Sequence, residues 1–229
     1  MKKAPILLSL VLLFIMGYTA GITETNETSE VEDIVQEAIH THENIDSVYE
    51  QVESSYEEEG VVNISNVWVY SDGSDKGYRI ENTSGEAAYG NVNGTGYRLN
   101  KEENTLYQFA ENPDEKLQNQ EMLARTLEHM MSNDEYSLRY GGEEDINGTP
   151  ANKVIFEGET SETEGNQYEV WFDEESHYRL QEKNIIGEGD DLITTVVDHD
   201  TNIEHDPELF SLLNLKDENT TTIYGEPEL

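Results

Sequence analysis

The sequence predicts an α+β domain in which one broad, curved antiparallel sheet is covered by a few helices. In many short segments apolar and polar residues alternate, which is the pattern of strands with one apolar and one solvated face. These segments mostly follow one another through short turns, so an antiparallel meander is expected. Two other segments carry apolar residues at helical spacing. Aromatic residues gather on one face of the expected strands, and we interpret that face as a binding surface as well as a core.

Length and charge limit the classes of function. A chain of 229 residues, 35% of them hydrophobic, has about the length of one domain once an export segment is removed. Its 50 Asp and Glu against 13 Lys and Arg give a formal charge of -37, which argues against nucleic acid as a partner. High salt screens such charge, so a salt-loving (halophilic) source is the simplest inference. Alternating aromatic and β-branched residues exclude disorder for the middle of the chain.

Residues 1–21 are expected to be a signal peptide or an uncleaved membrane anchor. Lys2 and Lys3 precede an apolar run from Ile6 to Met16, and small residues follow at Thr19-Ala20-Gly21. Both alternatives place the rest of the chain outside the cell, secreted or held at the membrane surface. Residues 22–28 read as a polar linker, 29–214 as the domain and 215–229 as a polar tail. Sequons that suit an exported glycoprotein lie at Asn63, Asn82, Asn93 and Asn147, and also at Asn26 and Asn219.

Two helices are expected. The first begins at Ser29, which forms a capping box with Glu32, and its apolar stripe is Val31, Ile34, Val35, Ala38 and Ile39. The second begins at Asn112-Pro113, and its stripe is Leu123, Ala124, Leu127, Met130 and Met131. Adjacent methionines suit either a helix that fills gaps in a core or a lid that contacts a ligand, and both alternatives stay open.

The expected strands surround the second helix in the sequence. They begin at about Ser47, although 45–56 could also extend the first helix. They continue through 61–70 and the short segments around Tyr78, Tyr89 and Tyr97 to 106–110, and they resume at 135–140, 153–157, 166–173, 177–181 and 191–198. Trp171 falls on the polar face of its strand. Arg179 in the next strand is expected to lie beside Trp171 and to stack its cation on the ring, with a hot spot for a protein partner as the alternative.

No enzyme class is supported by a motif. The chain has no phosphate-binding loop, no dinucleotide fingerprint and no nucleophile elbow. It has no cysteine, which excludes disulfides and thiol chemistry. His40 and His42 diverge on a helix and cannot bind one metal together. His199 and His205 lie among Asp198, Asp200, Glu204 and Asp206, a possible environment for a divalent metal. In a strand Asp198 and Asp200 point to the face opposite His199, so a solvated acidic strand end is the preferred alternative. We therefore assign no catalytic residue, no cofactor and no metal, and expect the protein not to be an enzyme.

The candidate ligand-binding residues are the apolar residues assigned to one sheet face and to the second helix. A partly solvated cleft is a suitable place for rings with polar tips, and a fully packed core is the alternative for each residue. The strand candidates are Trp68, Tyr70, Tyr78, Ile80, Tyr89, Tyr97, Leu99, Leu138, Tyr168 and Phe172, and the helix candidates are Leu127, Met130 and Met131.

The order of the segments resembles the LolA-like superfamily of bacterial lipoprotein carriers, sorting proteins and related lipid-binding or sensor proteins. The resemblance covers about Glu30 to Leu213. It is carried by the order and spacing of individually weak motifs: 66–70 (NVWVY), 78–81 (YRIE), 91–97 (NVNGTGY), 136–138 (YSL), 146–151 (INGTPA), 170–173 (VWFD), 178–180 (YRL) and 206–210 (DPELF). Where carriers have a basic residue and a proline after the second strand, this chain has Ser71-Asp72-Gly73, which argues against lipoprotein transfer itself.

The resemblance implies a half-barrel of antiparallel strands around a few helices, with an apolar cavity for acyl chains or another hydrophobic ligand. Such members are noncatalytic. The expected function is therefore that of a cell-surface or secreted monomer that holds a lipid, an acyl chain or another hydrophobic small molecule, with a membrane-surface association through the N-terminal segment. The alternative is an envelope interaction or sensor domain whose half-barrel is filled by its own side chains.

Overall fold

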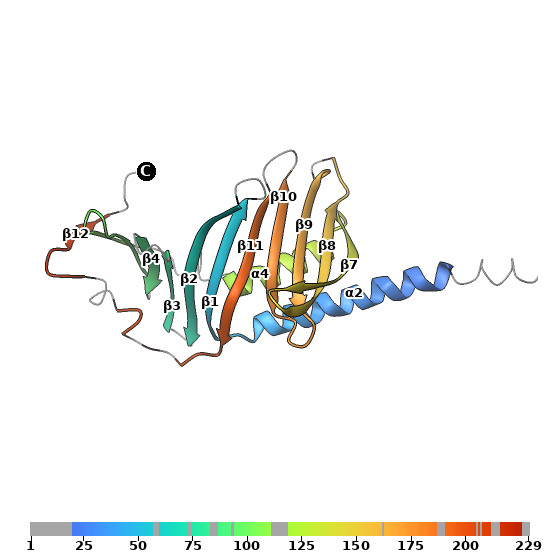
Figure 1. Ribbon diagram of the computed structural model, residues 1–229, viewed down its shortest axis with the longest axis horizontal. Helices are drawn as coiled ribbons and strands as arrows, with labels where there is room; N and C mark the ends of the chain where they lie inside the picture. Colours follow the sequence, from blue (N-terminus) through green and yellow to red (C-terminus); the bar gives the residue numbers. More distant parts are fainter. Residues whose placement is uncertain are drawn as a thin grey trace, which may run out of the picture.

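The chain folds into one large curved sheet with two helices on its concave side (Figure 1). The structure is a computed structural model and describes residues 20–56, 60–72, 75–82, 87–92, 94–110, 119–161, 163–186, 191–204, 206, 208–211 and 216–225. The elements are α2 (Ala20–Glu43), β1 (Ser47–Tyr56), β2 (Gly60–Asp72), β3 (Asp75–Asn82), β4 (Ala87–Val92), β5 (Thr95–Asn100), β6 (Thr105–Ala110), α4 (Asn119–Ser132), β7 (Tyr136–Ile146), β8 (Thr149–Gly158), β9 (Asn166–Asp173), β10 (Arg179–Ile186), β11 (Leu192–Thr201) and β12 (Thr221–Tyr224).

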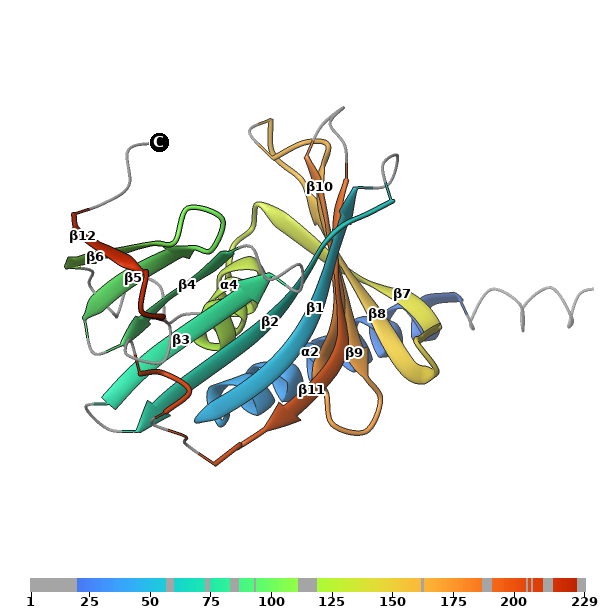
Figure 2. The same ribbon diagram turned by 60° about the vertical axis from the view of Figure 1, so that its left-hand side comes forward.

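The sheet has twelve strands in the order β12-β6-β5-β4-β3-β2-β1-β11-β10-β9-β8-β7. Neighbouring strands are antiparallel except β12, which pairs in parallel with β6. The sheet twists and curves without closing, so β7 and β12 form its two edges (Figure 2). The meander predicted from the sequence is therefore confirmed, and so is the half-barrel that the resemblance implied.

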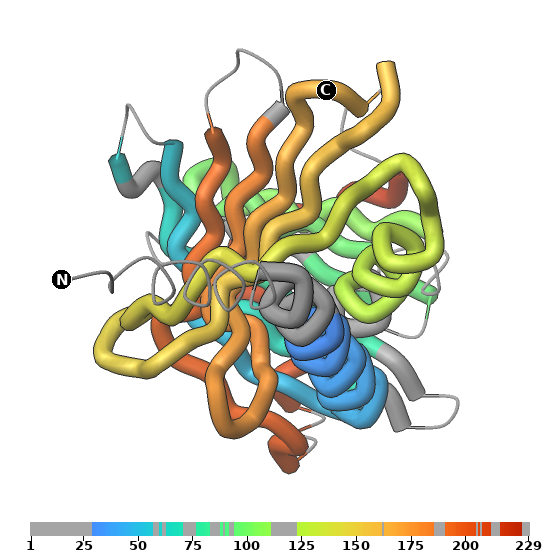
Figure 3. Tube along the Cα trace, turned by 90° about the vertical axis from the view of Figure 1, so that its right-hand side faces the viewer, coloured from blue at the N-terminus to red at the C-terminus, as the bar shows by residue number. Residues whose placement is uncertain are grey.

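The two helices cover only the β7–β9 end of the concave face. Helix α2 contacts α4, β7 and β8, and Figure 3 shows the two helices side by side, with α2 seen nearly along its axis. The expected stripes of both helices pack here against alternating residues of β8 and β9, which reflects the helical and strand periods in the sequence. The buried residues of this helix–sheet cluster are Val31, Val35, Ala38, Ile39, Leu123, Ala124, Leu127, Val154, Phe156, Tyr168, Val170 and Phe172.

A second cluster lies farther along the concave face. It consists of Val48, Val67, Val69, Tyr78, Tyr178 and Val196 from β1, β2, β3 and β11 and from the residue before β10. The register pairs Val48 with Val69 and Val69 with Tyr78, so these side chains share the concave face. The concave side of the sheet thus carries two separate apolar clusters.

The C-terminal segment packs on the outer face of β2 and β3. Phe210 packs on Tyr70 with ring centroids 4.4 Å apart, and the Arg79 guanidinium donates a hydrogen bond to the Leu209 carbonyl. Strand β12 then joins the sheet beside β6, although the sequence places it in a polar tail. Behind the segment lies an outer cluster of Ala88, Tyr97, Leu99 and Leu106. In β5 the outward-facing Tyr97 and Leu99 are therefore buried, whereas Arg98 between them is exposed.

The outer face near β8 and β9 holds the cation that stacks on Trp171, and the expectation that Arg179 fills this role is wrong. The Lys153 Nζ lies 4.4 Å from the centre of the Trp171 ring and 2.7 Å from a carboxylate oxygen of Glu169. The Trp171 indole nitrogen donates to Glu144 at 3.0 Å. Arg179 points to the concave face instead, because the register between β9 and β10 shifts between Arg179 and Gln181.

The first helix is longer than its cap predicts. Helix α2 already includes residues 20–28, so this stretch is helical backbone where the sequence predicts a linker, and Ser29 lies inside the helix, exposed to solvent. The expected start of the second helix, Asn112-Pro113, lies outside the described residues. No helix of the described part of the chain is both long enough and apolar enough to cross a bilayer.

We expect opposite effects from two substitutions in the outer cluster. The Tyr97 hydroxyl is buried and has no hydrogen-bond partner among the described residues, so Tyr97→Phe should raise the free energy of unfolding by about 1 kcal/mol. A Cβ on Gly90 would lie 2.3 Å from the Tyr78 carbonyl oxygen, so Gly90→Ala should lower it by about 2 kcal/mol. Urea titration measures both values, and a destabilised Tyr97→Phe would contradict the unpaired hydroxyl.

Candidate functional site

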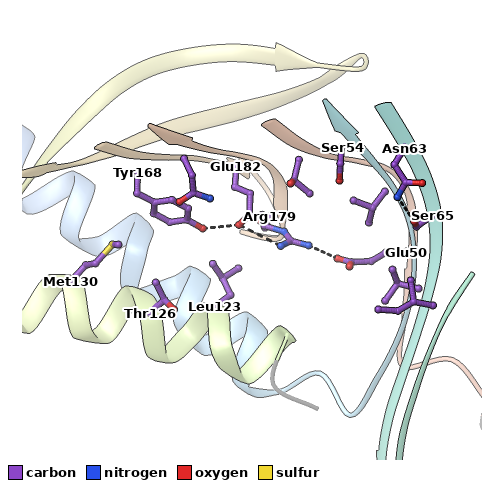
Figure 4. A pocket seen from close by; sticks show the side chains of 15 residues that line it. Glu50, Ser54, Asn63, Ser65, Leu123, Thr126, Met130, Tyr168, Arg179 and Glu182 are labelled. Carbon is purple, nitrogen blue, oxygen red and sulfur yellow. Dashed lines mark hydrogen bonds and ion pairs between the residues drawn. The ribbon is translucent and has the colours of Figure 1, made fainter. Parts of the chain in front are cut away.

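A cavity of about 460 Å³ lies between α4 and the concave face of the sheet (Figure 4). Its position is the gap between the helix–sheet cluster and the second concave cluster. Helix α4 supplies one wall, and strands β1, β2, β3, β9, β10 and β11 supply the other. The lining residues are Glu50, Val52, Ser54, Asn63, Ser65, Val67, Ile80, Leu123, Thr126, Met130, Tyr168, Arg179, Glu182, Asn184 and Thr194.

The secondary structure explains why these side chains meet. Leu123, Thr126 and Met130 are three and four residues apart, so they lie on one face of α4. On the sheet side, Val67 and Ile80 lie opposite each other on β2 and β3 and continue the apolar surface of the wall. The helix wall and the part of the sheet wall around Val67 and Ile80 are therefore mainly apolar.

The middle of the sheet wall carries a charge network. One Arg179 nitrogen lies 3.0 Å from a Glu50 oxygen and the other lies 3.5 Å from a Glu182 oxygen. The Tyr168 hydroxyl donates to the same Glu182 oxygen at 2.8 Å, and the Tyr178 hydroxyl donates to Glu50. With one cation and two carboxylates, the network carries a net charge of one negative unit.

Burial and charge shift the pKa values of this network. Burial and the neighbouring Glu182 carboxylate raise the pKa of Tyr168 well above its usual range. For Arg179, burial lowers the pKa, but the carboxylates of Glu50 and Glu182 outweigh it and raise that pKa above its ordinary value. Arg179 therefore stays charged and Tyr168 stays protonated, so both remain hydrogen-bond donors.

A stack of three rings ties α2 to the sheet next to this network. Tyr178 lies between His42 of α2, at 5.1 Å, and His199 of β11, at 4.2 Å. The His42 Nδ1 lies 2.8 Å from the Ala38 carbonyl oxygen, and its Nε2 accepts from the Arg179 backbone amide at 3.4 Å. Both contacts suit a neutral ring that carries its proton on Nδ1. Burial lowers the pKa of His42 to about 4.

The structure separates the thirteen sequence-predicted ligand residues into three groups. Ile80, Met130 and Tyr168 line the cavity. Leu127, Phe172, Met131 and Leu138 belong to or pack against the helix–sheet cluster, and Tyr78 belongs to the second concave cluster. The remaining residues point away from the cavity or are not described: Trp68, Tyr70, Tyr97 and Leu99 lie on the outer face, and the side chain of Tyr89 lies outside the described residues.

The expectation that all these aromatic residues share one face is therefore wrong. In β2 the concave residues are Val67 and Val69, whereas Trp68 contacts Tyr49 and Arg79 on the other side. The segment 67–70 is apolar on both faces, so alternation alone cannot distinguish the concave face from the outer face. The polar lining was missed because small hydroxyl residues in a strand resemble a solvated face.

The structure also places several of the predicted glycosylation sites. Asn147 is exposed in the turn between β7 and β8, Asn82 is half-buried, Asn93 lies outside the described residues, and Asn63 lines the cavity, where a glycan would compete with a ligand. His205 lies outside the described residues. Within the described ranges, no three His, Asp or Glu side chains are placed to hold a metal ion.

Removing the central cation should destabilise the fold strongly. Arg179→Met removes the cation from between two carboxylates, and the Glu50 side chain is only 3% exposed, so the free energy of unfolding at pH 7 should fall by about 3 to 5 kcal/mol. Adding Glu50→Gln should recover part of the loss. Arg139→Met is the matched control, because its pair with Glu157 is about half exposed and should change stability by less than about 1 kcal/mol. Equal effects at the two arginines in urea titration would contradict a buried network.

The buried His42 should make stability depend on pH. Its pKa falls from 6.5 to about 4 on folding, so below pH 6.5 the unfolded chain binds a proton that the folded chain excludes. The exclusion of this proton contributes about 3 kcal/mol to the pH dependence of the free energy of unfolding. The contribution is fully present above pH 6.5 and is lost as the pH falls to 4. Urea titrations at pH 7 and pH 4 should show that this loss is absent in His42→Gln. The same pH dependence in variant and wild type would contradict a neutral buried ring.

No family profile matches the sequence, and no curated protein matches it. Several solved structures are similar. Lipoprotein LppX of Mycobacterium tuberculosis has a TM-score of 0.53 and 12% identity, over 78% of this chain and 98% of LppX. LprF of Mycobacterium bovis has a TM-score of 0.51 and 11% identity, over 78% and 96%. MucB in the MucA/MucB complex of Pseudomonas aeruginosa has a TM-score of 0.55 and 12% identity, over 85% of this chain and 64% of MucB.

Identity this low shows the fold alone. Both the order of the strands around two helices and the open, curved sheet agree with that fold. The chain therefore shares the α+β half-barrel fold of these structures, which is the fold that the resemblance noted in the sequence implied.

Proposed function

We propose that this protein is a noncatalytic binding protein that holds a hydrophobic ligand, a lipid or an acyl chain, between α4 and the concave face of the sheet. The observation that supports this most directly is the cavity itself, which separates two apolar clusters that would otherwise form one core. Its volume of about 460 Å³ is within the range of ligand sites, roughly 300 to 1,000 Å³.

The apolar lining supplies the driving force. Val67 and Ile80 on the sheet face Leu123 and Met130 on the helix, and burying an apolar ligand among them releases on the order of 25 cal/mol per Å². Met130 is only partly buried, and its flexible thioether can adapt to different ligands. Helix α4 contacts α2 more extensively than it contacts the sheet. A small movement of α4 on the sheet is therefore the proposed entry route.

The location of the protein is part of the same proposal. The charged N-terminus and the apolar run after it favour export, with the domain secreted or held at the outer surface of the membrane. A ligand carrier of this kind would act as a monomer, since the site is complete within one chain.

A second candidate is an envelope interaction or sensor domain. The MucB structure carries the same fold in a complex with the protein MucA, and in the chain described here the helix–sheet cluster fills one end of the half-barrel with its own side chains. Mass spectrometry of an organic extract of the native protein distinguishes the two: lipid in stoichiometric amount supports the binding protein, and a clean extract supports the sensor.

Blocking the cavity should abolish binding without unfolding the protein. Thr126 is partly buried on the cavity side of α4, so Thr126→Trp should place a ring in the cavity and lower the affinity for the fluorescent probe N-phenyl-1-naphthylamine by about tenfold or more. Val197 is 39% exposed, and Val197→Trp is the matched control that should bind as wild type does. Undiminished binding by Thr126→Trp would place the probe elsewhere and count against this cavity.

A further inference from the structure

The wall of the cavity is not uniformly apolar, and its polar part is ordered. Glu182 of β10 pairs with Thr194 of β11, Thr194 pairs with Ser54 of β1, and Ser54 pairs with Asn63 of β2. Residues directly opposite in antiparallel strands point to the same face. These four side chains therefore form one row across four strands, about 14 Å long at roughly 4.8 Å per strand, and all four line the cavity. We call them the polar row.

The polar row has unused hydrogen-bonding capacity. Within the described part of the chain, no side-chain hydrogen bond involves the Ser54 or the Thr194 hydroxyl, and only one oxygen of Glu182, Oε2, has a partner. The Asn63 amide nitrogen donates to Ser65 at 2.7 Å, which leaves its carbonyl oxygen facing no described donor. Hydroxyls, an amide and a carboxylate oxygen spaced along a wall suit a ligand that presents several hydroxyl groups.

Charge selects among polar head groups. The Glu50–Arg179–Glu182 network at one end of the row carries one net negative charge, and the chain as a whole carries -37. A carboxylate or phosphate head group would meet repulsion there. A quaternary ammonium would meet Glu182 but would leave Thr194, Ser54 and Asn63 without partners. Uncharged hydroxyls can pair with every member of the row.

From this arrangement we propose that the ligand is an uncharged amphiphile with a hydroxyl-rich head, of the glycosyl or glyceryl type. The head lies along the polar row, and the apolar part lies against Val67, Ile80, Leu123 and Met130. This inference rests on the proposed function, because it specifies the ligand of the same cavity.

Calorimetric titration with amphiphiles of equal chain length tests the head group. The probes are dodecyl β-glucoside, dodecanoate and dodecyltrimethylammonium, each below its micellar concentration, with the wild-type chain in high salt. We expect the glucoside to bind about tenfold more tightly than either charged probe, because one or two additional uncharged hydrogen bonds account for a difference of this size. Tighter or equal binding of dodecanoate or of dodecyltrimethylammonium overturns the inference and leaves the proposed function standing. A chain that binds none of the three overturns both.

Two variants locate the effect in the polar row. The double variant Ser54→Ala/Thr194→Val removes two hydroxyls with little change of shape, and it should weaken glucoside binding about five- to tenfold. Thr195→Val is the matched control, because Thr195 lies on the same strand but bonds to Gln181 on the outer face. Glucoside affinity that is unchanged in the double variant overturns the assignment of the row.

Discussion

The structure depends on a mismatch between a long sheet and the two short helices available to cover it. Twelve strands form a concave face that α2 and α4 cover only near β7, β8 and β9. An uncovered apolar face in water is unfavourable in proportion to its area. The two faces differ in what lies on them. The C-terminal segment packs on the outer face of β2 and β3, and the concave face carries a second apolar cluster beside a cavity.

Three of the few basic side chains are largely buried in the sheet. Most of the chain's charge is negative and stays at the surface, but Arg79, Lys153 and Arg179 are largely buried, with side chains 12% to 16% exposed. Each lies beside at least one carboxylate, so the cost of burying its charge is offset by a specific partner. Arg179 is the one among these three that faces the cavity. Its backbone amide donates to the His42 ring of α2, and its guanidinium pairs with Glu50 of β1 and Glu182 of β10, so it links α2 to the polar wall of the cavity.

The candidate site combines features of a lipid pocket with features of a polar one. Opposite the apolar face of α4 stands a wall whose residues change from Val67 and Ile80 to serine, threonine and asparagine within a few strands. A cavity meant only for a hydrocarbon chain would gain nothing from the polar groups, since each must stay solvated or find a partner. The half-barrel fold supplies the hollow, and the residues of this chain give it an amphipathic character.

By itself the sequence determined the α+β class, the antiparallel meander, both apolar helix stripes and most strand positions, because these depend on periods of 3.6 and 2.0 that can be counted along the chain. It also placed Ile80, Met130 and Tyr168 among the cavity residues. Only the tertiary structure decided which face of β2 and β5 is concave. Trp68 and Tyr97 look like core residues in the sequence, but they lie on the outer face, where residues of neighbouring strands contact them. The tertiary structure likewise decided that Lys153 and not Arg179 meets Trp171, since a single register shift moves a side chain to the other face of the sheet.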